Sequence, residues 1–211
     1  MLEILPLILG PVATNAYLIA DSDTHEAAVI DPAWDGRLIA AEAEHHNWRI
    51  GQIWITHAHF DHIGGVGDLT HEMEVAPVIA LHPNDRLLWD SQGSAALFGF
   101  KLHASPAPTH NLAHNLNLLL GGITFKVLHT PGHTPGHCVF YCASAGVCFC
   151  GDLIFQNSVG RTDLPGGDWE TLVTSIRSQV FSLPDETRLL SGHGPETTVG
   201  QEKSENPFVG A

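Results

Sequence analysis

The chain has 211 residues, of which 44% are apolar and 15% are charged, and its 9 Lys and Arg against 23 Asp and Glu give a formal net charge of −14. This length and apolar content fit a single domain over residues 1–211 and exclude disorder over most of the chain. The scarcity of Lys and Arg disfavours binding to nucleic acid or to anionic membranes, because both need clustered positive charge.

The N-terminal segment is apolar but does not resemble a signal peptide. The first basic residue is Arg37, Glu3 and Pro6 interrupt the apolar run, and no small-residue cleavage site follows. No stretch approaches the roughly 18 apolar residues of a membrane-spanning helix. We therefore expect a cytoplasmic protein that has neither a membrane nor a nucleic-acid partner.

The first half of the chain predicts alternating strands and helices. Short runs rich in Ile, Leu and Val between Gly, Pro or polar residues are typical of strands. The predicted elements are strands Leu2–Leu9, Ala13–Ala20 and Ala27–Ile30, a helix Asp35–His46, strands Gln52–Thr56 and Val78–Leu81, and a helix Pro83–Leu97. Residues 98–114 predict a long irregular loop, and loops of that size are often functional.

The second half predicts two hairpins followed by helices. In Asp168–Phe181, apolar residues recur at helical spacing and Asp168 stands at the N-cap position. The other predicted elements are the strand pairs Leu116–Leu120 with Ile123–His129 and Cys138–Cys142 with Val147–Cys150, the strand Thr187–Leu190 and a short helix Thr198–Ser204. Strands and helices in two similar halves indicate an α/β fold with helices outside central sheets.

The segment Thr56-His57-Ala58-His59-Phe60-Asp61-His62 is the most informative in the sequence. It places four side chains that can bind metal within six positions, directly after a predicted strand. Ligands collect at the carboxyl ends of strands in open α/β sheets. Imidazole and carboxylate groups together suit zinc, iron or manganese. The segment therefore predicts a metal site.

Three further side chains of the same kinds follow later predicted strands. His133 lies in a PGHTPGH turn, Asp152 follows a glycine, and His193 lies between two glycines. Each occupies the end of a strand, so each can point into one common cleft. We predict that these residues complete the metal site.

The combination of HxHxDH, PGHTPGH, GD and GHGP resembles the metallo-β-lactamase superfamily over nearly the whole chain. That resemblance implies an αβ/βα sandwich of two mixed sheets, with helices on the outer faces and metals at one edge. It implies two divalent ions, zinc first and iron or manganese as alternatives, and a hydroxide shared between them. The implied ligands are His57, His59 and His133 for one ion, Asp61, His62 and His193 for the other, and Asp152 as the bridge, with Asp61 also the candidate catalytic residue.

The segment Gly151–Asp168 and the ending GHGPETTVGQEKSENPFV are similar to single-domain bacterial glyoxalase II-like hydrolases. This similarity implies hydrolysis of a small-molecule thioester such as S-lactoylglutathione. Larger glyoxalase II enzymes bind glutathione through basic groups of a C-terminal helical domain. That domain is not expected here, because residues 194–211 are too few and contain a single basic residue, Lys203. A homo-oligomer whose second subunit completes the pocket is compatible with this pattern.

Other functions are weighed against the hydrolase. The sequence GRTD at 160–163 also resembles persulfide dioxygenases, which hold one iron through residues matching His57, His133 and Asp152. A metal-binding protein without turnover is a third alternative. A β-lactamase would normally be exported, and a nuclease would need a basic surface, so both are disfavoured.

Several residues have alternative roles. Arg161 either binds a substrate carboxylate or pairs with Asp163 or Asp168 to hold its loop. His137 either orients a metal ligand or belongs to the turn. Asn15 and Tyr17 are expected to contribute packing, and the cysteines to be free core residues. The histidines of the irregular loop, expected at its surface, are His103, His110 and His114.

Overall fold

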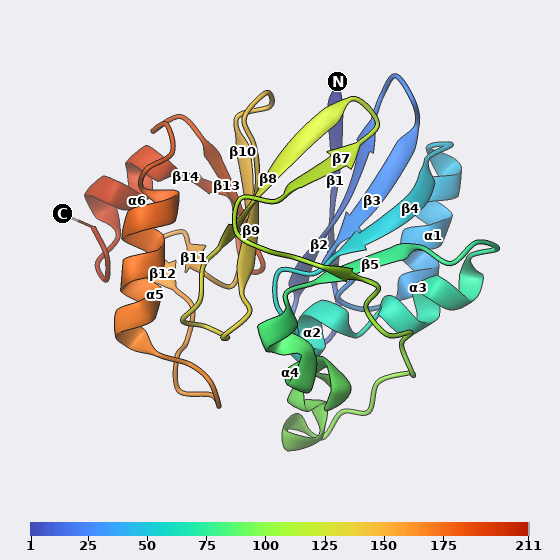
Figure 1. The fold of residues 1–211 in the computed structure, drawn as a ribbon, viewed down its shortest axis with the longest axis horizontal. Helices are drawn as coiled ribbons and strands as arrows, with labels where there is room; N and C mark the ends of the chain where they lie inside the picture. Colours follow the sequence, from blue (N-terminus) through green and yellow to red (C-terminus); the bar gives the residue numbers. More distant parts are fainter. Residues whose placement is uncertain (211) are drawn as a thin grey trace.

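Two six-stranded mixed β-sheets pack face to face, with helices on both outer faces, in the computed structural model, which describes residues 1–210 (Figure 1). The predicted α/β sandwich is confirmed. The first sheet has the order β1 (Leu2–Leu9), β2 (Thr14–Asp21), β3 (Glu26–Ile30), β4 (Arg49–Trp54), β5 (Val78–Leu81), β6 (His110–Asn111). The second has the order β14 (Thr197–Thr198), β13 (Arg188–Ser191), β10 (Val147–Gly151), β9 (Cys138–Cys142), β8 (Ile123–His129), β7 (Asn117–Leu120).

The core lies between the sheets and beneath the helices. Strand β2 is buried along its whole length, and its alternate residues contribute to different clusters. Leu18 joins the cluster beneath the helices of the first half, whereas Ile19 faces the second sheet. A strand covered on both faces is a continuous apolar run, as this one is in the sequence. Across the interface, the Trp54 ring meets Phe125 edge-on at 4.9 Å between centroids.

Helices of the first half cover one outer face, and those of the second half cover the other (Figure 1). They are α1 (Gly36–His45), α2 (Phe60–Ile63), α3 (Val66–Glu72) and α4 (Arg86–Asp90), then α5 (Trp169–Ser175) and α6 (Val199–Glu205). The N-cap prediction is confirmed, because Asp168 accepts a hydrogen bond from the Thr171 backbone at 2.8 Å. The predicted helix continues beyond α5 as a π-helical turn, Ile176–Val180.

The single helix predicted over Pro83–Leu97 is wrong. This segment divides into a 3-10 turn (Pro83–Asp85), α4 and a kinked 3-10 segment (Gln92–Phe98). Gly93 has φ +63°, and a Cβ there would lie 2.6 Å from the Ala58 carbonyl oxygen. The chain therefore turns at this glycine to let the backbone of the HxHxDH segment pass, a contact that helical periodicity does not reveal. Helix α3 and the short ribbon of β11 (Ile154–Phe155) and β12 (Ser158–Val159) were not predicted either.

Within residues 1–210, no helix combines the length and apolarity needed to cross a membrane. The cysteines at 138, 142, 148 and 150 are free and buried in strands β9 and β10, as expected. Strands β10 and β13 are parallel, and Gly151 pairs with Ser191 at their carboxyl ends. The next residues of both strands therefore emerge together at one edge of the sandwich.

Candidate metal centre

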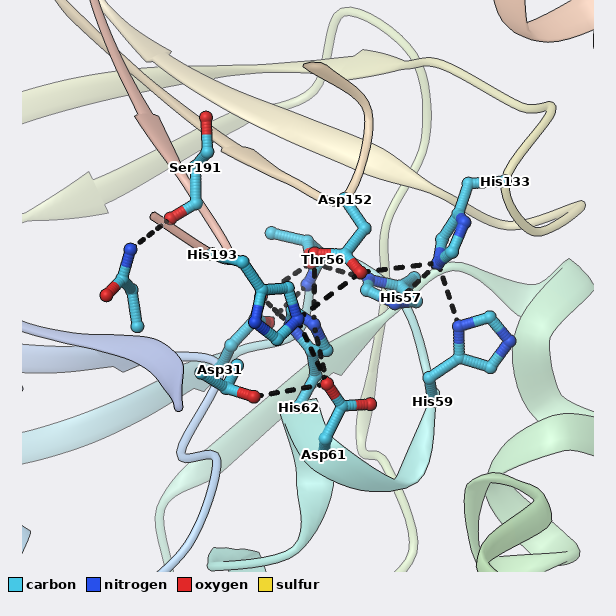
Figure 2. Close-up of polar contacts among 12 residues, drawn as sticks. Asp31, Thr56, His57, His59, Asp61, His62, His133, Asp152, Ser191 and His193 are labelled. Carbon is cyan, nitrogen blue, oxygen red and sulfur yellow. Dashed lines mark hydrogen bonds and ion pairs between the residues drawn. The ribbon is translucent and has the colours of Figure 1, made fainter. Parts of the chain in front are cut away.

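The side chains predicted to bind metal converge at this edge, in the opening between the two sheets (Figure 2). One group follows β4 and runs into α2, and the others follow β8, β10 and β13. The structure brings together His57, His59, Asp61, His62, His133, Asp152 and His193. Segments more than a hundred residues apart in sequence thus meet in one cluster.

Three imidazoles form the first part of the cluster. The Nε2 atom of His133 lies 3.1 Å from Nε2 of His57 and 2.8 Å from Nδ1 of His59. Burial lowers the pKa of all three rings, to about 3 for His59, so the rings are neutral at physiological pH. Neutral imidazoles present lone pairs, the form in which histidine binds a metal ion.

Hydrogen bonds to the opposite ring nitrogens fix which atoms carry those lone pairs. Nδ1 of His133 donates to the Arg161 carbonyl at 2.8 Å, which leaves Nε2 without a proton. Thr56 donates its hydroxyl proton to Asp31, so its oxygen accepts from Nδ1 of His57 at 3.0 Å. Both Nε2 atoms are therefore acceptors that face each other, an arrangement that favours a cation between them.

The second part of the cluster combines a carboxylate with two imidazoles. Asp61 Oδ2 lies 3.2 Å from His193 Nε2 and 3.5 Å from His62 Nε2. Burial acts to lower the pKa of His62, but Asp152 and Asp61 outweigh it and hold that pKa well above its usual range. The carboxylates thus favour positive charge at this position, as either a proton or a metal ion.

Asp152 lies between the two parts. Its Oδ1 is 3.2 Å from His62 Nε2, and its Oδ2 is 3.7 Å from His133 Nε2 and 3.6 Å from His193 Nε2. Although Oδ1 of Asp152 and Nε2 of His62 are close, they are not aligned for a hydrogen bond, and both buried atoms have no hydrogen-bond partner among the described residues. Buried polar atoms are rarely left unpartnered, so this pair fits a bound cation. The donor set of nitrogen and oxygen atoms suits zinc or iron.

Two buried carboxylates that sequence reasoning missed support the cluster. Asp31 accepts hydrogen bonds from the Thr56 backbone, the Thr56 hydroxyl and His62 Nδ1 at 2.7, 2.6 and 2.9 Å. Asp85 accepts from the Ala58 backbone at 3.0 Å, and also from the loop that carries His133. Asp31 directly follows the predicted strand Ala27–Ile30, a position that by itself gives no sign of these partners.

Asn15 and Tyr17 are buried, but they do more than pack. The Asn15 amide donates to the carbonyl oxygens of Ser191 and Gly194, each at 2.9 Å. The Tyr17 hydroxyl donates to Ser191 at 2.7 Å. Both residues therefore hold the loop that carries His193, and they tie the first sheet to the second.

The remaining candidates lie at or beyond the edge of the cluster. The Arg161 guanidinium pairs with Asp163 through two contacts of 2.7 Å, and about half of its side chain is exposed. The His137 ring stacks at 5.2 Å from that of His57 and binds the Thr130 hydroxyl, with no contact to the cavity. His103 and His114 are exposed, as predicted for the irregular loop, but His110 lies half-buried in β6, where it pairs with β5. None of these three histidines lines the cavity.

A cavity of about 440 Å³ opens above the cluster. Ligand side chains form its floor, and Arg161 is part of its wall. The rest of the wall is apolar and consists of Val12, Phe60, Phe98, Phe155, Val159 and Leu164. A small molecule in this cavity would touch the His/Asp cluster and an apolar wall at once.

The model of the metallo-beta-lactamase superfamily matches residues 9–193 of the chain. The chain belongs to this superfamily. Its relatives include the probable metallo-hydrolase YqgX of Bacillus subtilis, 38% identical over 95% of this chain and 94% of that protein. The hydroxyacylglutathione hydrolase GloC of Haemophilus influenzae is 36% identical over 99% of this chain and 97% of that protein. The superfamily resemblance seen in the sequence is confirmed.

Solved structures of the superfamily share the whole fold. BLEG-1, named a B3 metallo-beta-lactamase, has a TM-score of 0.90 and 38% identity over 99% of both chains. TTHA1623, described in a di-iron-bound form, has a TM-score of 0.88 and 39% identity over 97% of this chain and 99% of the other. ETHE1 from Myxococcus xanthus has a TM-score of 0.82 and 25% identity over 98% and 84%. The chain therefore has the metallo-beta-lactamase fold, and its own His and Asp side chains form groups that can hold metal ions.

Proposed function

We propose that the protein is a metal-dependent thioester hydrolase with two divalent ions, and that zinc is the ion bound most readily. The carrying observation is the position of Asp152 between the two parts of the cluster. Its Oδ1 lies 3.2 Å from His62 in the second part, and its Oδ2 lies 3.7 Å from His133 in the first. The similarity to GloC supports the thioester as the bond that is cleaved. S-lactoylglutathione is accordingly the reference substrate.

The reaction is the addition of water to a thioester. The water oxygen bonds to the carbonyl carbon, the carbon–sulfur bond breaks, and the sulfur keeps the electron pair and takes one proton. The second proton passes to solvent and leaves a carboxylate. Divalent ions at this cluster would lower the pKa of water and polarise the carbonyl.

The side chains of this protein have separate tasks in that reaction. One ion would be held by His57, His59 and His133, and the other by Asp61, His62 and His193, with Asp152 shared. Burial acts to raise the pKa of Asp61, but His62 outweighs it and keeps that pKa below its usual range. The ionised carboxylate faces the cavity, where it would accept a proton from the attacking water.

The persulfide dioxygenase alternative needs only three of these residues, namely His57, His133 and Asp152. The other four predicted ligands lie in the same His/Asp cluster, and their presence there favours two ions and hydrolysis. The free, buried cysteines support the proposed location in a reducing compartment such as the cytoplasm.

Elemental analysis and two assays on one sample test this function. Loss of S-lactoylglutathione absorbance reports hydrolysis, and oxygen uptake with glutathione persulfide reports the dioxygenase. We expect two metal equivalents and hydrolysis without oxygen uptake. Oxygen uptake with intact thioester refutes the hydrolase, and neither activity at full metal occupancy supports a protein without turnover.

Variants of the cluster separate the two-ion mechanism from simpler ones. His59→Ala and Asp61→Ala should abolish hydrolysis and leave the circular dichroism spectrum unchanged. His71→Ala is the matched control, because the His71 side chain is 82% exposed. Near-normal turnover in either cluster variant contradicts the mechanism.

Arg161 is tested in the same assays. A role in binding a substrate carboxylate requires it to leave Asp163, and its pairing there supports the alternative role of holding the loop. If Arg161 binds substrate, Arg161→Ala raises KM. Unchanged kinetics with a lower melting temperature assign it to the loop.

A further inference from the structure

The apolar wall of the cavity comes from both halves of the sandwich. Val12 lies in the turn between β1 and β2, Phe60 begins α2, and Phe98 ends the 3-10 segment. On the opposite side, Phe155 ends β11 and Leu164 lies in the loop after β12. With Val159, these residues form an apolar collar around the entrance to the His/Asp cluster.

Packing holds the collar in place while its rim stays open. The Phe60 ring lies 5.1 Å from that of Phe98, and the Phe155 ring meets His193 edge-on at 6.1 Å. Val12 and Phe98 nevertheless keep 45% and 42% of their surface exposed. Large apolar side chains exposed around a cavity mark a site where an apolar ligand is buried.

Among the described residues, the wall of the cavity offers no unpaired cationic side chain to a carboxylate of the ligand. Among residues 1–210, the cavity lining contains one Lys or Arg, which is Arg161, and Asp163 already occupies its guanidinium. The other acidic and basic lining groups belong to the His/Asp cluster. Glutathione carries two carboxylates remote from its sulfur, so a glutathione thioester would leave both without a cationic partner in this wall.

We propose that the collar selects thioesters with an apolar acyl chain on an uncharged thiol in preference to glutathione thioesters. This proposal rests on the proposed thioester hydrolase and specifies its substrate class. The thioester carbonyl lies over the His/Asp cluster, and the acyl chain contacts Phe98 and Phe155. Each methylene that the collar removes from water stabilises the bound state and the transition state.

A series of acyl chains on one neutral thiol tests the collar. Acetyl, butyryl and hexanoyl thioesters of N-acetylcysteamine are compared with S-lactoylglutathione by kcat/KM. Burial of a methylene predicts a gain of about fourfold for each one that reaches the collar. We expect kcat/KM to rise along the series, and the hexanoyl thioester to exceed S-lactoylglutathione.

Variants of the collar separate recognition of the acyl chain from a general loss of folding or activity. Phe98→Ala and Phe155→Ala should each lower the ratio of kcat/KM for the hexanoyl thioester to that for the acetyl thioester by roughly tenfold. Leu87→Ala is the control, since Leu87 is 84% exposed and outside the cavity. Two collar variants on different elements guard against one that fails to fold.

A binding measurement makes the proposal independent of turnover. Calorimetry compares the uncleavable thioethers S-hexyl-N-acetylcysteamine, S-ethyl-N-acetylcysteamine and S-hexylglutathione on the metal-loaded protein. We expect S-hexyl-N-acetylcysteamine to bind most tightly. Equal binding of the hexyl and ethyl thioethers, or tighter binding of S-hexylglutathione, overturns the collar proposal. Hydrolysis of S-lactoylglutathione with no preference for longer chains overturns it too but leaves the hydrolase standing, whereas no thioester cleavage refutes the hydrolase alone.

Discussion

Replacing Asp31 by asparagine is the most direct test of how the metal-binding histidines are oriented. Asp31 is 2% exposed, and its Oδ2 accepts from both the Thr56 hydroxyl and His62 Nδ1. The Thr56 oxygen in turn accepts from His57 Nδ1. One carboxylate oxygen therefore determines where the proton sits on two rings of the cluster.

In Asp31→Asn, the oxygen facing the Thr56 backbone is kept and the other is replaced by an NH₂ group. The Thr56 hydroxyl and the His62 Nδ1–H group, which both donated to the carboxylate oxygen, then face the N–H groups of the new amide. To accept a hydrogen bond from that amide, His62 has to move its proton from Nδ1 to Nε2. That proton occupies the lone pair that would hold the metal. Losing a support of this kind lowers metal affinity by about 10- to 100-fold, which corresponds to about 1.4–2.8 kcal/mol.

The variant should also be less stable without metal. Two hydrogen bonds to a buried carboxylate are lost, at about 1.5–3 kcal/mol each before rearrangement, so a net loss of about 2–4 kcal/mol is expected. Chelator competition measures zinc affinity, and urea unfolding measures stability. Asp23→Asn is the control, with a side chain 84% exposed. Wild-type zinc affinity in Asp31→Asn would refute the argument that Asp31 sets the proton positions.

Three further predictions follow from the packing. In Gly192→Ala the new Cβ would overlap Asp152 Oδ1 and lie 2.6 Å from His62 Cε1. The metal content of this variant should therefore fall, while its circular dichroism spectrum stays unchanged. Gly51→Ala is the control and should retain its metal, because a Cβ there meets nothing within 4 Å. His82 stacks on His129 at 4.0 Å, and burial, then the charge of His129, lower its pKa from 6.5 to about 4. The unfolded chain takes up that proton first, so stability falls as pH drops from 6.5 to 4, and urea titrations of His82→Gln should show a weaker fall. The four buried thiols should react with Ellman's reagent only after unfolding, and fewer than four without reductant would reveal a disulfide.

Much of the fold could be predicted because burial on two faces leaves a simple pattern in the sequence. Strand β2 and the helix that begins at Trp169 follow directly from apolar runs and helical spacing. The segment from Pro83 to Leu97 could not be predicted, because its kink at Gly93 depends on a close contact with the backbone of Phe60. That contact joins residues far apart in sequence, and the local spacing of apolar residues does not indicate it.

The seven predicted ligands share a local signal: each is a histidine or aspartate that follows a predicted strand and lies either in the HxHxDH segment or beside a glycine. Asp31 follows a strand too, but its partners Thr56 and His62 are 25 and 31 residues away. A single carboxylate before a proline gives no sign of such partners. Asn15 was assigned to packing for the same reason, since its acceptors lie in the last quarter of the chain.

Asp85 shows why these unrecognised residues matter to the chemistry. Its carboxylate accepts hydrogen bonds from the Ala58 backbone at 3.0 Å and from the Gly136 backbone at 2.6 Å, so it links the HxHxDH segment to the loop of His133. A Cβ at Gly136 would lie 2.7 Å from the backbone nitrogen of Asp85, so the PGHTPGH turn needs glycine there for the carboxylate to approach. Asp85 and Asp31 therefore anchor different parts of the cluster from behind. The ring nitrogens are held close together before any ion binds, and the metal need not supply the free energy of bringing the two loops into contact.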